Sequence, residues 1–179
     1  MNMKGIVAAA LVVSVLAAGA YAQAPAPKPG AEQTRIGYFA GTWNIEGDSK
    51  ASPMGPGGKL KAKETCQWFP GGFQLVCHSD GTNPMGSAKT QSVMGYDPTE
   101  KTYTYYAISS VGDNFFVRGN VSGKVWTWNT ESVVNGKPMK LRVTVTEESP
   151  TAYSFKMEAS FDGGAFAVLE ESKATKANN

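Results

Sequence analysis

Residues 124–147, KVWTWNTESVVNGKPMKLRVTVTE, contain two segments of alternating polarity separated by Asn135-Gly136. Asn-Gly is a preferred pair for a two-residue hairpin turn of the primed type. Such a turn places Trp126 opposite Val145 and Trp128 opposite Val143, so that one face is apolar while the other carries matched polar and charged pairs. Because a shift by one residue would mix the two sets, the sequence predicts this register within an antiparallel sheet.

The same alternation continues on both sides of this hairpin. Short segments separated by glycine, proline, serine, asparagine or aspartate predict strands near 41–48, 59–69, 73–79, 87–96, 102–109, 114–121, 124–134, 138–147, 152–161 and 165–173. No long amphipathic helix interrupts the series. The sequence therefore predicts an all-β protein, an antiparallel up-and-down meander of about ten strands that closes into a barrel and so avoids exposed edges.

Two further turns extend the apolar face. A turn at Gly71-Gly72 places Cys66 opposite Cys77 and Trp68 opposite Leu75, which predicts a disulfide between the two cysteines of the chain. The loop-closure model assigns such a bridge roughly 3 kcal/mol of stability. The alternative is a metal-binding pair with His78 beside it, but a closed zinc site needs four ligands.

A turn at Ser122-Gly123 would align the neighbouring strand with the first hairpin. Phe115, Val117 and Gly119 would then stand opposite Thr130, Trp128 and Trp126, respectively. Three adjacent strands would share one apolar face.

The first residues carry the pattern of an export signal. Lys4 precedes an apolar run over 5–19, and Ala-Tyr-Ala at 20–22 fits the small-x-small cleavage rule. We expect a signal peptide at 1–22, a Pro/Ala-rich tether at 23–35, a single β-barrel domain at 36–174 and a disordered tail at 175–179. A short helix or turn is expected between 31 and 39.

These assignments predict a periplasmic or secreted protein, without a transmembrane segment once the signal is removed. Export implies an oxidising compartment, which favours the disulfide. The formal net charge of the whole chain is only +2. Such a balance gives no electrostatic reason to expect nucleic acid as a partner.

Few residues are candidates for chemistry. His78, the only histidine, falls on the outward face opposite Thr65 and is interpreted as a surface residue rather than a metal or haem ligand. Glu64 falls on the inward face opposite Ser79, where it could act as an acid, a base or a ligand anchor, unless it lies at a hydrated rim. Glu170 is a second candidate, since a two-residue turn within 162–164 would place it on the face of Phe155 and Met157, whereas a three-residue turn would place Glu171 there instead.

The sequence also resembles a known family. Gly-Thr-Trp at 41–43 resembles the first-strand signature of lipocalin-like barrels, in which the tryptophan closes one end. Further motifs are Ser-Pro-Met-Gly-Pro-Gly-Gly at 52–58, Cys-Gln-Trp at 66–68 before Pro-Gly-Gly-Phe at 70–73, Met-Gly-Tyr-Asp-Pro at 94–98 and Tyr-Ser-Phe-Lys-Met-Glu at 153–158. Together they resemble the bacterial domain-of-unknown-function family 1579, which implies a lipocalin-like, calycin-type barrel but no activity.

Residues 41–47 also resemble the first strand of the haem-binding nitrobindins. Those proteins use a histidine late in the chain, whereas His78 lies in the third predicted strand. Haem is therefore not expected. No catalytic residue, metal ligand or cofactor is assigned.

The leading functional hypothesis is that the barrel binds a small apolar or amphipathic molecule in its interior. The predicted ligand-binding residues are Glu64 as the polar anchor, with Trp68, Leu75, Phe115, Trp126, Trp128, Leu141 and Met157. One alternative is an envelope structural or interaction protein with a filled core. A less favoured one is an isomerase- or lyase-type enzyme that uses an interior carboxylate.

Overall fold

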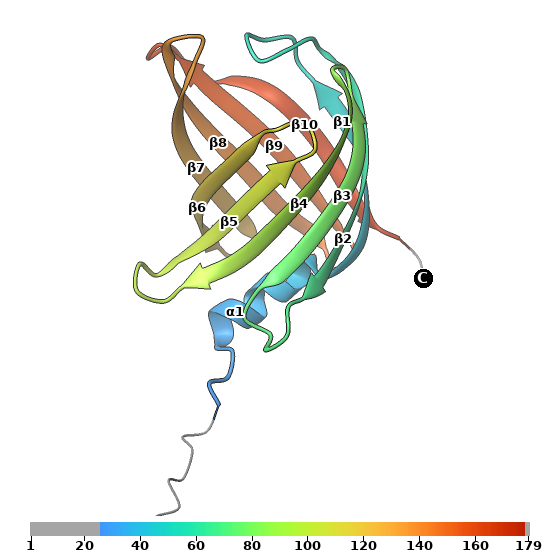
Figure 1. The fold of residues 1–179 in the computed structure, drawn as a ribbon, viewed down its shortest axis with the longest axis vertical. Helices are drawn as coiled ribbons and strands as arrows, with labels where there is room; N and C mark the ends of the chain where they lie inside the picture. The colour runs from blue at the N-terminus through green and yellow to red at the C-terminus, as the bar shows by residue number, and fades with distance from the viewer. Residues whose placement is uncertain (1–25, 178–179) are drawn as a thin grey trace, which may run out of the picture.

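The computed structural model describes residues 26–177, so the predicted signal peptide lies outside the described residues. These residues form one short helix, one 3₁₀ turn and ten strands in a closed barrel (Figure 1). The helix is α1 (Ala31–Ile36), followed by η1 (Gly37–Phe39). The strands are β1 (Gly41–Ser49), β2 (Gly58–Trp68), β3 (Leu75–Asn83), β4 (Gly86–Asp97), β5 (Thr102–Ser109), β6 (Asn114–Ser122), β7 (Val125–Val134), β8 (Lys137–Ser149), β9 (Ala152–Phe161) and β10 (Ala167–Lys176).

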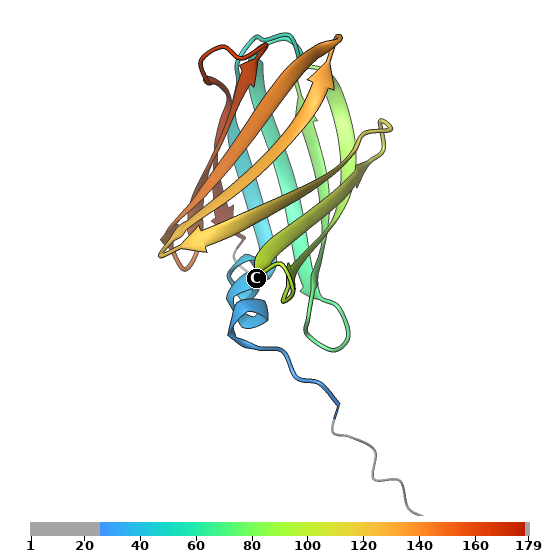
Figure 2. The same ribbon diagram turned by 90° about the vertical axis from the view of Figure 1, so that its left-hand side faces the viewer.

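The barrel has the predicted up-and-down topology. Each strand pairs antiparallel with the next, and β1 pairs with β10 to close the sheet, with Trp43 opposite Lys176. The helix lies across one end, which we call the closed end, and the C-terminus leaves the barrel near the same end (Figure 2). The predicted all-β barrel is confirmed.

Two of the three predicted hairpin registers are confirmed. Trp126 pairs with Val145 across β7 and β8, and Cys66 pairs with Cys77 across β2 and β3. The β6–β7 register is wrong by two residues, because Gly119 pairs with Trp128 rather than with Trp126. Gly123 occupies the first turn position with a φ of +58°, where a two-residue type II′ turn requires glycine. A shift of two residues keeps the same side chains facing inward.

Several element limits differ from the expected ones. Strands β3 and β4 continue through the predicted 80–86 loop until Asn83 pairs with Gly86, which leaves a two-residue turn. Strand β10 extends to Lys176, into the expected tail at 175–179. The last residues of the expected tether at 23–35 belong to α1.

The closed end is sealed by aromatic side chains from the helix and the strands. Ile36, Trp43 and Trp126 have no exposed surface, and Phe39 contacts the Trp126 ring with centroids 5.1 Å apart. Trp43 Nε1 donates a hydrogen bond of 2.8 Å to the backbone carbonyl of Phe39, which fixes the helix segment to β1. This placement agrees with the end-closing tryptophan implied by the lipocalin-like resemblance.

A second, smaller cluster lies at the other end of β7 to β10. Met139, Ala159 and Leu169 are buried there, with Leu141 and Met157 packed against them. Leu169 occupies an irregularity between Val168 and Glu170, where β10 gains one residue against β9. The two clusters leave between them a middle level of the interior, which holds the candidate site.

Candidate functional site

Inward-facing side chains at the middle of the barrel keep part of their surface accessible. They lie on the same side of the sheet as the buried residues, yet each is only partly buried. In a filled barrel these positions would be sealed by close packing. Water therefore reaches part of each of these residues. The residues are Glu64, Ser79, Thr90, Tyr105, Thr130, Val143, Phe155 and Ser172.

Glu64 is the most unusual member of this set. The alternation of β2 turns it inward, because Lys63 and Thr65 face outward on either side, and it stands opposite Trp43 on β1 and Ser79 on β3. Among residues 26–177 it has no hydrogen bond or ion pair, and its oxygens are not sealed from solvent. Burial in the barrel raises the pKa of Glu64 to about 7, since the charged form loses water there.

Two tyrosines from other strands face the same region. Burial, reinforced by the negative charge of Glu64, raises the pKa of Tyr105 to about 12, despite a hydrogen bond with Ser92. The same two causes raise the pKa of Tyr153 still further above its ordinary value. Both phenols therefore remain protonated at neutral pH and present hydroxyl groups near the carboxylate.

An aromatic wall continues from Tyr105 across β6 and β7. The Tyr105 ring stacks on Phe115 with centroids 5.8 Å apart and lies 6.1 Å from Trp128. Trp128 in turn stacks on Trp126 at 6.2 Å with nearly parallel planes. The carboxyl group of Glu64 thus shares the interior with a continuous set of ring faces.

The disulfide lies beside Glu64. Cys66 and Cys77 are bonded as predicted, and their sulfur atoms lie within 4.8 Å of each other and of a carboxylate oxygen of Glu64. Sulfur in a disulfide is not the thiolate that binds a metal ion. In the oxidised protein the three residues therefore form an apolar bridge and a single carboxylate, rather than a metal-binding set.

Glu170 is a second inward carboxylate, at a different level. It stands opposite Met157 on β9 and Ser49 on β1. The extra residue of β10 sets this pairing, because the register of Ala167 with Ala159 before it would have turned Glu171 inward instead. Burial raises its pKa, and a hydrogen bond of 3.5 Å donated by the Ser172 hydroxyl works in the opposite direction. Glu170 therefore lies within the interior, and Ser172 of the same strand partly stabilises its charged form.

The predicted ligand-binding residues divide into three groups in the structure. Leu75 and Trp126 are completely buried, so they form the floor at the closed end rather than an accessible wall. Trp68 lies under Gly37 at the same end and is 40% exposed. Leu141 and Met157 pack against the second cluster. Phe115, which is 47% exposed, and Trp128, which is 5% exposed, both contact Tyr105, which faces the level of Glu64.

Sequence reasoning missed several residues that define the site. Tyr153 lies on the predicted face of Phe155 and Met157, so alternation along β9 was enough to predict that Tyr153 faces inward. Tyr105 was missed because no register was predicted for β5. Arg35 forms an ion pair with Glu147 beneath the floor, which joins residues far apart in the sequence and has no local signal.

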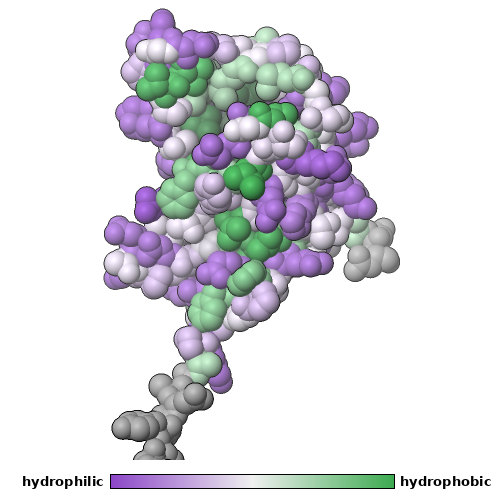
Figure 3. Space-filling view, viewed as in Figure 1, coloured by the Kyte–Doolittle hydropathy of each residue, from purple (hydrophilic) through white to green (hydrophobic). Residues whose placement is uncertain are grey.

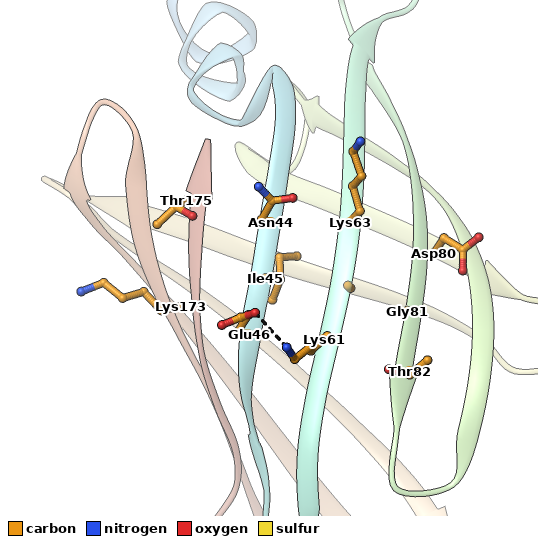
Figure 4. Close-up of a pocket in the computed structure, with 11 residues that line it drawn as sticks. Asn44, Ile45, Glu46, Lys61, Lys63, Asp80, Gly81, Thr82, Lys173 and Thr175 are labelled. Atoms are coloured by element: carbon orange, nitrogen blue, oxygen red, sulfur yellow. Dashed lines mark ion pairs between the residues drawn. The ribbon is translucent and has the colours of Figure 1, made fainter. Parts of the chain in front are cut away.

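The outer surface offers a less selective environment. A groove of about 710 Å³ crosses β10, β1, β2 and β3 and contains an ion pair of 3.2 Å between Lys61 and Glu46 (Figure 4). A second groove contains His78, which is exposed as predicted. Apolar patches interrupt the polar surface in the view of Figure 3. The grooves are open and lined by charges of both signs, which leaves the interior as the candidate site.

The comparisons with known proteins agree with the barrel. No curated protein shows significant similarity to the chain. The crystal structure of Rv2717c from M. tuberculosis is similar with a TM-score of 0.59 at 8% identity, covering 83% of this chain and 99% of that one. The S-type phycobiliprotein lyase CPES from Guillardia theta is similar with a TM-score of 0.53 at 10% identity, covering 83% and 93%. At these identities the likeness concerns the fold alone.

A family profile gives the more specific result. The profile described as "Protein of unknown function (DUF1579)" matches residues 28–176, which include α1 and all ten strands of the described barrel. The motifs at 41–43, 52–58 and 153–158 all fall within the match. The chain therefore belongs to the DUF1579 family, whose function is unknown.

Proposed function

We propose that the barrel binds a small apolar or amphipathic molecule in its interior, with Glu64 as the polar anchor. Ligand sites in proteins are concave, mostly apolar and supplied with a few oriented polar groups. The middle of this barrel has that composition, because aromatic rings surround one carboxyl and two phenol groups.

The observation that carries the proposal is the environment of Glu64. A carboxylate without a partner in a low-dielectric interior costs stability, as its raised pKa indicates. A filled structural core would place an apolar residue there at no such cost. A bound molecule that hydrogen-bonds or pairs with the carboxylate would offset it.

The opposite wall also favours space for a ligand. Around and above Glu64, the inward positions of β2 to β4 carry Ala62, Ser79, Gly81, Ala88 and Thr90, all small, up to the buried Leu60 further along β2. Large side chains concentrate instead on β5 to β9. A barrel lined on one side by small residues and on the other by rings leaves room between them.

The experiment is native mass spectrometry of gently purified protein, followed by titration with an environment-sensitive hydrophobic dye. We expect either a co-purified small molecule or saturable dye binding at one site per chain. Protein that carries nothing and takes up no dye would contradict the proposal and favour the filled-core interaction protein.

The pKa of Glu64 supports a second candidate function. A carboxyl group with a pKa of about 7 can both donate and accept a proton near neutral pH, as an isomerase- or lyase-type reaction requires. The test is deuterium incorporation from D₂O into a set of bound carbonyl compounds, followed by NMR. Exchange that disappears in Glu64→Gln would support catalysis, and its absence from every compound would oppose it.

We also infer that the protein is exported. The Cys66–Cys77 disulfide is the state expected in an oxidising compartment. Separately, none of the helices in the described part of the chain is long and apolar enough to cross a membrane. Fractionation of cells expressing the full chain tests the inference, and recovery with reduced cysteines in the cytoplasm would contradict it.

A further inference from the structure

We infer that the molecule bound in the barrel is an organic cation, an apolar body that carries a basic or quaternary nitrogen, with the nitrogen placed at Glu64. This inference rests on the proposed interior binding function and specifies its ligand class. It follows from the charges of the inward face, from the rings around Glu64 and from the absence of a partner for its carboxylate in the described structure.

The charges of the interior are unequal. In the described strands, alternation gives inward positions to two lysines, and both lie at strand ends. Lys137 forms an ion pair of 3.3 Å with Asp162, and the Lys176 ammonium lies 5.0 Å from the centre of the Trp43 ring. Glu64 and Glu170 therefore leave the interior two carboxyl groups, at different levels, and neither forms an ion pair with a lysine or arginine of the described strands.

The one arginine at the floor is already used. Arg35 is ion-paired with Glu147 and lies 5.0 Å above the Trp126 ring. It therefore compensates the floor carboxylate and leaves Glu64 unneutralised. The closed end shows in the same molecule how a carboxylate, an indole face and a cation combine. At Glu64 the carboxylate and the Trp43 indole recur, but the Lys176 ammonium over that indole forms no ion pair with Glu64 in the described structure.

The rings near Glu64 favour a positive charge over a negative one. Aromatic faces attract cations, most strongly where water is excluded. The Trp43 indole stands beside Glu64 in the sheet, and Tyr105 and Tyr153 feel the charge of its carboxylate. An anionic ligand would meet two carboxylates and the negative ring faces, so the interior would disfavour it.

The pH dependence follows from the groups that face Glu64. These are Tyr105 from β5, Tyr153 from β9 and, across Trp43, Lys176 from β10. Both phenols stay protonated at neutral pH, because their pKa values are raised. Glu64 is the group at this level whose pKa, about 7, falls between about pH 5 and pH 8, whereas Glu170, whose pKa burial also raises, lies at a different level. Binding of a permanent cation should strengthen as the pH rises through about 7, and below that it should release a proton.

The experiment compares three probes with the same alkyl chain. Decyltrimethylammonium, decanol and decanoate are titrated by calorimetry into the full mature chain below their micelle concentrations. At about pH 8 we expect the ammonium to bind roughly tenfold more tightly than the alcohol and decanoate to bind more weakly than both. At about pH 5.5 the advantage of the ammonium should largely disappear.

Two variants distinguish the contribution of the Glu64 charge from that of apolar binding in the interior. Glu64→Gln should bind decanol like the wild type but lose the preference for ammonium, whereas Glu171→Gln, an exposed outward glutamate on β10, should keep it. Titrations near pH 6 in buffers of different ionisation enthalpy should show proton release in the wild type and none in Glu64→Gln.

The outcomes distinguish the two proposals. If none of the three probes binds, interior binding itself is contradicted. If the probes bind without a preference for the cation, or if the preference survives in Glu64→Gln, interior binding stands and the cation inference is overturned. Tighter binding of decanoate at about pH 8 would also overturn it.

Discussion

The indole Nε1 of Trp126 donates a hydrogen bond of 2.6 Å to Oε1 of Glu147, and the same carboxylate is ion-paired with Arg35 of α1. The floor of the barrel is thus held by a carboxylate shared between a strand aromatic and the only helix in the described chain. Glu147 is 9% exposed, so these two partners take the place of most of the water around its carboxylate.

Removing the cation should loosen the closed end. In Arg35→Met the aliphatic contact with Trp126 is kept while Glu147 loses its ion pair, and we expect a loss of about 2 kcal/mol in the free energy of unfolding. Urea unfolding monitored by tryptophan fluorescence measures this loss. In a double-mutant cycle, Glu147→Gln should reduce the effect of the Arg35 change, whereas additive effects would show that the pair is not coupled.

Glu64 should make the stability of the barrel depend on pH. Its pKa is about 7 in the folded protein against an ordinary 4.5, so the folded state holds the proton more tightly than the unfolded chain. Stability should therefore fall as the pH rises from about 4.5 to about 7, by at most about 3 kcal/mol.

The comparison of Glu64→Gln with the wild type at about pH 5 and pH 8 isolates this contribution. The neutral amide should gain stability relative to the wild type at the higher pH. Glu171→Gln is the matched exposed control and should show no such gain. Equal pH profiles for the wild type and Glu64→Gln would mean that Glu64 titrates as it does in water.

The disulfide should contribute mainly by restricting the unfolded chain. Cys66 and Cys77 are 11 residues apart and join β2 to β3 across one hairpin. The loop-closure model gives about 3 kcal/mol for a loop of this size. We expect Cys66→Ala/Cys77→Ala to unfold at correspondingly lower urea concentration while its far-ultraviolet circular dichroism at zero urea stays that of a barrel.

A bulky residue beside Glu64 should block the interior without removing the carboxylate. Ser79 stands opposite Glu64 on β3 and faces inward, while the adjacent His78 faces outward. Ser79→Phe should abolish binding of the hydrophobic dye, and His78→Phe should leave it unchanged. If the two variants bind alike, the dye does not enter the barrel.

The fold was largely predictable because the sequence alternates strictly on both sides of its glycine turns. Asn135 and Gly136 both take positive φ, of 51° and 78°, as the primed turn requires, and this fixed the β7–β8 register. The β6–β7 turn was misplaced because glycine can occupy either turn position, and only three-dimensional closure selects between them.

The candidate site was predictable only in part. Glu64 and Phe115 follow from alternation along their own strands, which is a local property. The tilt of the strands around the barrel decides which inward residues share a level. Alternation along single strands therefore could not predict that Leu75 is completely buried or that Tyr105 and Tyr153 approach Glu64. The docking of α1 depends likewise on contacts between distant residues.

The pairing of Trp43 with Lys176 brings both chain ends of the described barrel to the side that α1 seals. A fusion partner, an affinity tag or a surface linker attached at either end would hang below the floor. Protein immobilised through either end would then present the opposite rim of the barrel to the solution. Sensor-chip measurements of small-molecule uptake can therefore use attachment at the N-terminal or the C-terminal end without blocking access to that rim.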